Sequence, residues 1–169
     1  MTEPNALEIL EAERAIQSVL TQYARGVDRC DESLLRDCYW PDSTDDHGDY
    51  KGSGYGFAAW VVELLAKVFS STQHAISNTR IECSLDDDIA RVESYLVARH
   101  VTRADPPGLV EVGGRYLDRF SRRDGQWRIA RRVVVVDWSR ISLIERSVPA
   151  GEFQQGRRMP DDPSYSEDV

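Results

Sequence analysis

Long apolar runs are missing from this sequence of 169 residues. No stretch approaches the roughly 20 consecutive apolar residues that a membrane-spanning helix requires. The opening residues, MTEPNALEILEAERA, are acidic and lack the basic, apolar and small-residue regions of a secretory signal. We therefore expect a cytoplasmic protein that does not bind membranes.

Cysteine and positive charge are also scarce. Cys30, Cys38 and Cys83 form an odd set without CxxC spacing, which argues against a disulfide framework and against a thiolate zinc site. The formal net charge is -8, and the basic residues are scattered among acidic ones. Such a balance repels phosphate backbones, so nucleic acid is not an expected partner.

The first half of the sequence has the period of amphipathic helices. Three helices are predicted from the spacing of apolar residues, over 6–24, 31–39 and 57–69. Gly26 is expected to end the first helix, and Asp31 is expected to be the N-cap of the second. Residues 41–56 are rich in Asp, Ser and Gly, which predicts a loop or a short strand with turns.

The second half changes to the period of β-strands. Four long segments rich in β-branched and aromatic residues are predicted as strands, over 73–83, 89–101, 109–121 and 126–138. The turn sequence Arg123-Asp124-Gly125 is a strong hairpin signal. Helices followed by an antiparallel meander predict an α+β domain over 1–148, in which the helices cover one face of a curved sheet. Residues 149–169 are predicted to be an extended or disordered tail that could pack on a neighbouring subunit.

Two side chains far apart in the sequence are candidates for acid-base chemistry. His74 lies on the first predicted strand, and its face also carries Ile76 and Asn78. Asp28 follows the first helix, and because Asp31 is better placed to cap the second helix, the carboxylate of Asp28 is free for another role. A structural role remains open for each, as a hydrogen-bonded histidine in the sheet and as a capping aspartate.

Other side chains can face a pocket between the helices and the sheet. Tyr23 extends the apolar stripe of the first helix, and His100 lies on the apolar face of the second predicted strand, where it is either a core or a pocket-lining residue. In the last strand, Arg131 and Arg132 point to opposite faces, so one of them must share an apolar face. An inward arginine requires an anionic partner, whereas an arginine at the rim of the sheet does not.

The run Asp45-Asp46-His47-Gly48-Asp49 offers several metal-type ligands within one predicted loop. Adjacent residues in a short run rarely converge on a metal ion without further donors. We therefore predict no metal site in this segment.

Four segments, in their order and spacing, resemble the SnoaL-like branch of the nuclear transport factor 2-like superfamily. They are YARGVDRCD, WPDSTDDHGDYKG, STQHAISNTRIE and DGQWRIARRVVVVDW, and the similarity covers about residues 6–140. The resemblance implies a conical α+β barrel with a pocket inside the cone and assembly as a homodimer or homotrimer. The branch includes scytalone dehydratase-like, bile-acid dehydratase-like and dehydrochlorinase-like enzymes. These enzymes eliminate without a cofactor by means of an Asp/His pair, and Asp28 and His74 match that pair.

The resemblance also bears on the leaving group and on the pocket residues. Tyr23 matches the tyrosine of bile-acid dehydratase-like members, whereas dehydrochlorinase-like members carry a lysine there, and this favours loss of water over loss of halide. Arg132, or else Arg131, resembles the basic pocket residue of the family. His100 falls near the second histidine of scytalone dehydratase-like enzymes.

The function that follows from this resemblance is a cofactor-independent, dehydratase-type lyase acting on a hydrophobic or aromatic ring-containing small molecule. Neutral His74 removes a proton next to a carbonyl, Asp28 fixes the tautomer of His74, and Tyr23 assists the leaving oxygen or the enolate. The basic pocket residues stabilise negative charge on the substrate. Asn78 and Trp60 are the remaining residues expected to bind the substrate.

Two other functions remain open at this point. The same pair of residues can serve an isomerase or a cyclase, in which the proton is returned and no group is expelled. The superfamily also contains noncatalytic binding modules and small subunits, such as the β subunit of ring-hydroxylating dioxygenases, so the fold alone establishes no activity.

Overall fold

The predicted α+β class is confirmed by the computed structural model, which describes residues 6–144 and 153–166. The helices are α1 (Ala6–Arg29), α2 (Glu32–Asp37) and α3 (Gly54–Val68). The strands are β1 (Tyr39–Asp46), β2 (Lys51–Ser53), β3 (Phe69–Ser84), β4 (Ile89–Thr102), β5 (Gly108–Arg123) and β6 (Gln126–Leu143). A single 3-10 turn, η1 (Pro163–Tyr165), follows near the C-terminus of the described residues.

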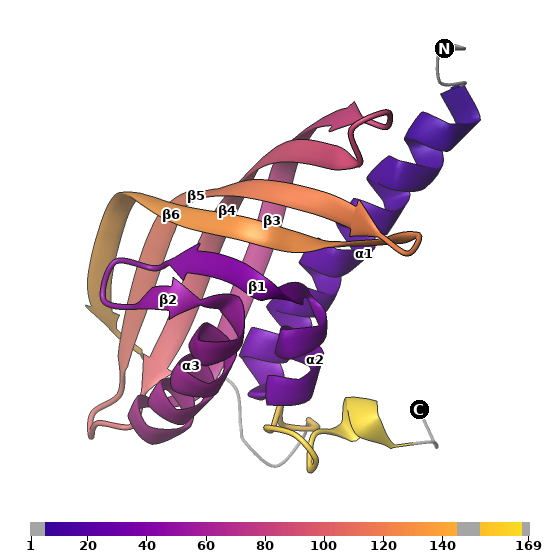
Figure 1. Cartoon of the computed structure of the whole chain (residues 1–169). Helices are drawn as coiled ribbons and strands as arrows, with labels where there is room; N and C mark the ends of the chain where they lie inside the picture. Colours follow the sequence, from indigo (N-terminus) through magenta and orange to yellow (C-terminus); the bar gives the residue numbers. More distant parts are fainter. Residues whose placement is uncertain (1–5, 145–152, 167–169) are drawn as a thin grey trace.

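The strands form one curved sheet in the order β2-β1-β6-β5-β4-β3, with α1 running along it (Figure 1). Strands β3 to β6 are the predicted antiparallel meander, and each is longer than the sequence pattern indicated. The hairpin between β5 and β6 is confirmed, since Asp124 and Gly125 have φ angles of 51° and 78°. Two consecutive positive φ angles are what a tight turn compatible with strand twist requires.

Strand β1 departs from the sequence prediction, which gave a loop or a short strand beginning at Pro41. It spans Tyr39–Asp46 and pairs with β6 in parallel, so the sheet is not a pure meander. Its sequence, YWPDSTDD, contains a proline and three acidic residues, all of which are depleted in strands. The proline is accommodated because the register with β6 shifts between Tyr39 and Thr44.

The predicted end of the first helix at Gly26 is wrong, because α1 continues to Arg29. Gly26 is buried against α2, and a Cβ atom at this position would lie 2.9 Å from Cγ of Leu35. The glycine therefore permits close approach of two helices, and the chain leaves α1 at Cys30, which has a φ of 52°. Asp31 is the N-cap of α2, as predicted, and its side chain accepts a hydrogen bond from the backbone N–H of Leu34.

The core lies between the helices and one face of the sheet. Helix α1 packs against β3, and α3 packs against β1. Fully buried side chains fill this space, among them Ile16, Leu20, Leu35, Phe57, Phe120 and Ile129. Within the described ranges, none of the helices is both long and apolar enough to cross a membrane.

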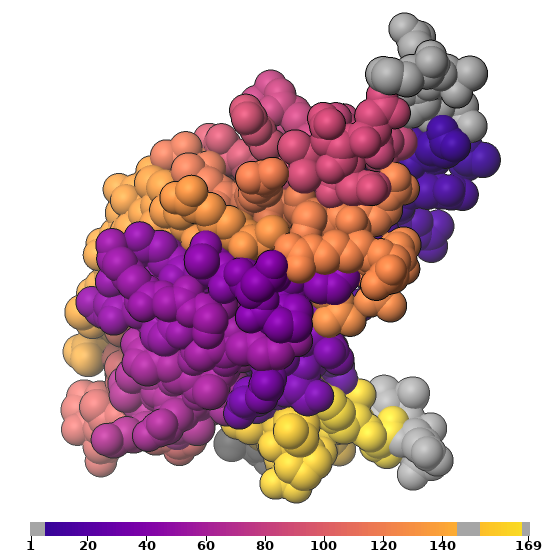
Figure 2. Space-filling model, in the orientation of Figure 1, coloured from indigo at the N-terminus to yellow at the C-terminus, as the bar shows by residue number. Residues whose placement is uncertain are grey.

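The end of the chain, over residues 153–166, lies against the C-terminal end of α1. Figure 2 shows it in yellow at the base of the molecule, next to the helices. The backbone N–H of Met159 donates to the carbonyl oxygen of Arg29 at 2.8 Å, and Tyr165 Oη donates to Asp31 Oδ2 at 2.9 Å. The predicted boundary between a domain over 1–148 and a tail falls in residues 145–152, which lie outside the described residues. That division stays a prediction.

Candidate active site

Asp28 and His74, which are 46 positions apart in the chain, are in direct contact. Oδ1 of Asp28 lies 2.7 Å from Nδ1 of His74, and Oδ2 accepts the backbone N–H of the same residue at 2.9 Å. Both side chains are nearly buried, with exposed fractions of 12% and 8%. In a neutral ring these contacts assign the proton to Nδ1, which leaves the lone pair of Nε2 free to accept a proton.

The position of Asp28 at the end of α1 explains why its carboxylate turns toward β3. A negative charge is unfavourable near the C-terminus of a helix, where the backbone carbonyls point outward. Two N–H groups of His74 offset this by binding both carboxylate oxygens. Arg158, in the C-terminal segment, donates to the carbonyl oxygen of Asp28 and, at 2.7 Å, to Oγ1 of Thr72 on β3. This guanidinium therefore ties together the two elements that carry the pair.

His74 faces a cavity of about 310 Å³ between the helices and the sheet. Its wall is mainly aliphatic and aromatic, with residues from α1, α3 and four strands, among them Val27, Phe57, Trp60, Leu65, Leu96 and Val134. Trp60 thus lies where the sequence analysis expected a substrate-binding residue. A mostly apolar cavity with a few converging polar groups is the usual form of a small-molecule site.

His100 lines the same cavity and lies beside His74. Their ring centroids are 5.3 Å apart in an edge-to-face arrangement, and the His100 ring also lies 4.9 Å from that of Phe69. Burial, reinforced by the neighbouring His74, lowers the pKa of His100 to about 4. His100 is therefore neutral at physiological pH, so it can offer the substrate a hydrogen bond but not a full positive charge.

Tyr23 also lines the cavity, and its hydroxyl oxygen lies 3.3 Å from Nε2 of His47. The ring of His47 stacks on Phe57 at 4.0 Å, and Nδ1 of His47 is bound by Oδ1 of Asp45. The other oxygen of Asp45 accepts the hydroxyl of Tyr39 at 2.6 Å. Burial raises the pKa of Tyr23 well above its ordinary value, so the phenol remains protonated.

Arg132, a predicted substrate-binding residue, is paired within the protein, and its role toward a substrate stays a prediction. Its side chain is fully buried and makes two hydrogen bonds to Asp118, at 2.7 and 2.6 Å. Its guanidinium also lies between the rings of Tyr23 and Tyr116, at 4.1 and 3.9 Å from their centroids. The inward arginine does have an anionic partner, as burial demands, but that partner is an aspartate of β5 and not a substrate. The alternative residue, Arg131, is exposed.

Asn78 is the second expected substrate-binding residue that the structure does not place at the cavity. It is exposed and has a φ of 44°. The pairing of β3 with β4 shifts register between Ser77 and Arg80, so the alternation of faces is interrupted at this point. The alternation of faces counted from His74 therefore does not hold beyond Ser77, and for this reason Asn78 does not share the face of His74.

The acidic run around His47 forms no metal centre in the structure. Across residues 6–144 and 153–166, there is no group of three or more His, Cys, Asp or Glu side chains able to hold a metal ion. Asp45 and His47 bind each other, whereas Asp46 forms an ion pair with Lys51.

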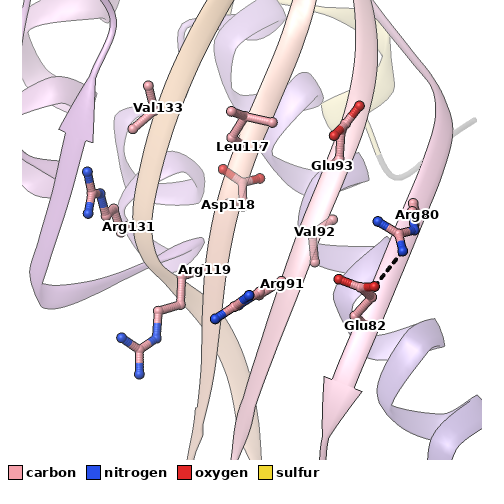
Figure 3. A pocket seen from close by; sticks show the side chains of 10 residues that line it. All are labelled: Arg80, Glu82, Arg91, Val92, Glu93, Leu117, Asp118, Arg119, Arg131 and Val133. Atoms are coloured by element: carbon pink, nitrogen blue, oxygen red, sulfur yellow. Dashed lines mark hydrogen bonds and ion pairs between the residues drawn. The ribbon is translucent and has the colours of Figure 1, made fainter.

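A second depression, of about 430 Å³, lies on the face of the sheet turned away from the helices (Figure 3). Charged side chains from β3, β4, β5 and β6 surround it, and Arg80 is paired with Glu82. The described residues that line it include no aromatic ring and no histidine. Of these two hollows, the cavity on the helical side is therefore the one that holds histidines and aromatic rings.

Sequence reasoning did not predict that His47 lines the cavity and binds Asp45, nor that Asp118 is the partner of Arg132. A signal for the first two exists, since Tyr39, Ser43, Asp45 and His47 are spaced as one face of a strand. That reading requires residues 39–46 to be recognised as a strand, which their composition disfavours.

Comparison with known proteins identifies the family. A model described as the SnoaL-like domain matches residues 8–133, about three quarters of the chain. The chain belongs to the SnoaL-like family. This SnoaL-like protein is 25% identical over 128 residues to hexachlorocyclohexane dehydrochlorinase 1 of Sphingobium indicum, an alignment that covers 74% of this chain and 81% of the relative.

Solved structures share the fold of this SnoaL-like protein. One is a type 2 hexachlorocyclohexane dehydrochlorinase, LinA, with a TM-score of 0.76 and 20% identity over 87% of this chain and 99% of the other. Another is a candidate scytalone dehydratase from Novosphingobium aromaticivorans, with a TM-score of 0.69 and 23% identity over 85% and 96% of the two chains. These likenesses support the nuclear transport factor 2-like fold that the sequence resemblance implied.

Proposed function

We propose that this SnoaL-like protein is a cofactor-independent lyase that eliminates water from a ring-containing, mostly apolar small molecule. The observation that carries the proposal is the contact between Asp28 and Nδ1 of His74 at the wall of an apolar cavity. The names of the relatives, a dehydrochlorinase and a candidate scytalone dehydratase, agree with elimination chemistry.

In the proposed reaction, Nε2 of His74 removes a proton from a carbon next to a carbonyl group. Asp28 holds the ring in the required tautomer and stabilises the imidazolium that forms. The electrons of the broken C–H bond form the new double bond as the hydroxyl group leaves. The imidazolium returns its proton to the departing oxygen, so that one molecule of water is released and His74 is regenerated.

Two features of the cavity favour water over halide as the leaving group. Tyr23 lines the cavity, so a lone pair of its phenolic oxygen can accept a hydrogen bond from a hydroxyl group of the substrate. Among the described residues that line this cavity, none is a lysine or an arginine that could bind a departing halide by its charge. Elimination of an oxygen leaving group is therefore the form of lyase chemistry that these residues support best.

The test is a panel of bicyclic β-hydroxy ketones incubated with the protein, with products followed by mass spectrometry. We expect a product lighter by one water molecule. His74→Ala and Asp28→Asn should each lower the rate by about 100- to 10,000-fold, which is the usual contribution of general base catalysis. Asp42→Asn is the matched control, because Asp42 is exposed and pairs only with Arg123 among the described contacts.

Each other result of this assay argues against the proposal. A product of unchanged mass would indicate isomerisation or cyclisation in place of elimination. Equal rates in the wild type and in both variants would remove Asp28 and His74 from the chemistry and would favour a binding module.

A further inference from the structure

A second histidine-carboxylate pair reaches the cavity from another part of the sheet. His74 comes from β3, at one edge, whereas His47 directly follows β1, near the opposite edge. Helix α1 serves both pairs, since it supplies Tyr23 to His47 and Asp28 to His74. Five residues of helix separate the two positions, which corresponds to about 7.5 Å along the helix axis.

The hydrogen-bond partners of His47 determine the direction in which a proton can move. Asp45 binds Nδ1, so a neutral His47 ring carries its proton on Nδ1 and accepts a hydrogen bond at Nε2. The group at Nε2 is the hydroxyl of Tyr23, which must therefore be the donor. With its only hydrogen directed to His47, the oxygen of Tyr23 has only lone pairs left to offer, and the guanidinium of Arg132 and the hydroxyl of Tyr116 lie beside it.

The charged groups around His47 are buried and paired with one another. Asp45 and Tyr39 are almost completely inaccessible, and their hydrogen bond holds the carboxylate in place. On the neighbouring strands, the positive charge of Arg132 is matched by Asp118. Burial lowers the pKa of His47, an effect that Asp45 opposes and that Arg132 and His74 reinforce. The ring is consequently a neutral acceptor in the resting protein.

We propose that Tyr23, His47 and Asp45 form a proton relay that accepts the proton of a substrate hydroxyl group. The substrate is then a molecule with an acidic O–H group, a phenol or an enol, in addition to the C–H group that faces His74. This inference rests on the proposed function, because it concerns the same cavity and the same substrate.

The proton transfer is balanced without any further reactant. The O–H bond of the substrate and that of Tyr23 break, while a new O–H bond forms on Tyr23 and an N–H bond forms at Nε2 of His47. The positive charge of the imidazolium is offset by Asp45, and the charge left on the substrate oxygen supplies electrons for expulsion of a leaving group. Expulsion of the leaving group leaves a neutral carbonyl oxygen. Removal of the C–H proton by His74 restores the negative charge on this oxygen, and reversal of the transfer then returns the relayed proton to it, while His74 gives its own proton to the departing hydroxide. In this scheme Tyr23 touches the substrate, and Asp45 is a positioning residue.

The first test uses para-nitrophenol, whose phenolate form absorbs visible light, and measures the ionised fraction of the bound dye against pH. We expect the bound dye to ionise about one pKa unit lower in the wild type than in Tyr23→Phe or His47→Asn, a tenfold change in the ratio of phenolate to phenol. In the variants, the apolar wall disfavours the phenolate and the relay no longer accepts its proton. Tyr23→Phe removes a single oxygen atom, so it preserves the packing of the ring.

The matched control is Tyr50→Phe. Tyr50 also packs against Phe57 and Trp60, but its hydroxyl donates to the carbonyl oxygen of Ser53, so the dye should ionise as in the wild type. Equal ionisation in the wild type, Tyr23→Phe and His47→Asn would overturn the relay. An effect of Tyr23→Phe without an effect of His47→Asn would also overturn it, because Tyr23 would then act alone.

A second measurement requires no ligand. Nitrogen NMR of the histidine rings should show the proton of His47 on Nδ1, and Tyr23→Phe should raise the pKa of His47, because a hydrogen bond to the neutral ring is removed. A proton on Nε2 of His47 at neutral pH contradicts the relay. Neither measurement involves a C–H bond. These results therefore test the relay independently of the elimination assay, and either proposal can be contradicted without the other.

Discussion

His100 links the chemistry of the cavity to the stability of the fold at the scale of a single residue. Its pKa of about 4 in the folded chain lies below the value of about 6.5 for an exposed histidine. Between these values the unfolded chain binds more protons, so the free energy of unfolding falls as the pH is lowered from about 6.5 toward about 4. Above about pH 6.5 this contribution to stability is fully present.

The corresponding experiment is urea unfolding of the wild type and His100→Asn at about pH 7 and about pH 5. We expect the wild type to lose up to about 2 kcal/mol more than the variant between these two pH values. The contribution of His47 is common to both proteins and cancels in the comparison. Parallel losses in the two proteins would show that His100 is not held neutral by the fold.

A second prediction for single residues concerns the buried ion pair of Arg132 and Asp118 and its contribution to stability. Arg132→Met leaves the carboxylate of Asp118 buried without its partner, and we expect a loss of about 3–5 kcal/mol in the free energy of unfolding. The double variant Arg132→Met with Asp118→Leu replaces the pair by apolar side chains and should recover most of that loss. Chemical denaturation measures both. A double variant as unstable as the single one would contradict this account of the pair.

The same two residues show what the sequence could not reveal. An inward arginine and an arginine at the rim of the sheet were both left open for the last strand, and nothing in the sequence indicated that Asp118 stands opposite Arg132. That fact depends on the register of β5 and β6, which pairs these two positions. The contact between Asp28 and His74 was expected only because a family resemblance supplied it.

Among the elements, the junction of α1 with α2 is sharply constrained by Gly26. Exchange of glycine for alanine inside a helix ordinarily stabilises it by about 1 kcal/mol. Here the new Cβ would lie 2.9 Å from Cγ of Leu35, so we expect Gly26→Ala to destabilise the protein by about 1–3 kcal/mol. Leu35→Ala removes the contact with Cγ but leaves the backbone nitrogen of residue 35 at 3.2 Å, so in that background the same change should destabilise less. Thermal unfolding of the four proteins distinguishes these effects.

The C-terminal segment provides a further prediction for the elements around the site. Arg158→Met removes the hydrogen bonds to the carbonyl of Asp28 and to Thr72, and we expect a loss of about 1–3 kcal/mol in the free energy of unfolding. Arg157→Met is the control, because the side chain of Arg157 is exposed and only its backbone N–H binds Asp162. Equal stability of the two variants would show that the segment does not brace the end of α1.

Helices and strands with a regular spacing of apolar residues could be predicted from the sequence, whereas a strand without that spacing could not. Strands β3 to β6 and the three helices follow periodic apolar residues, which the sequence displays directly. Strand β1 has few strand-forming residues and depends on pairing with β6, a contact between distant parts of the chain. For that reason Asp45 and His47 were placed in a loop, and neither their contact nor the place of His47 in the cavity wall was recognised.

At the scale of the whole molecule, helices on one face of a curved sheet leave a largely apolar hollow with three histidines in its wall, His47, His74 and His100. The central claim is that His74, held by Asp28, removes a proton from carbon inside this hollow. Such chemistry requires a neutral imidazole with a free nitrogen and an environment from which water is largely displaced. The geometry of the described residues provides the imidazole and the apolar wall.

The most direct test is hydrogen exchange of a bicyclic ketone, β-tetralone, in heavy water, followed by mass spectrometry. The exchange reports proton removal next to the carbonyl and requires no leaving group. We predict that the wild type accelerates deuterium incorporation and that His74→Asn lowers this acceleration by at least about 100-fold. Deuterium incorporation at the same rate with the wild type, with His74→Asn and with buffer alone would contradict the account.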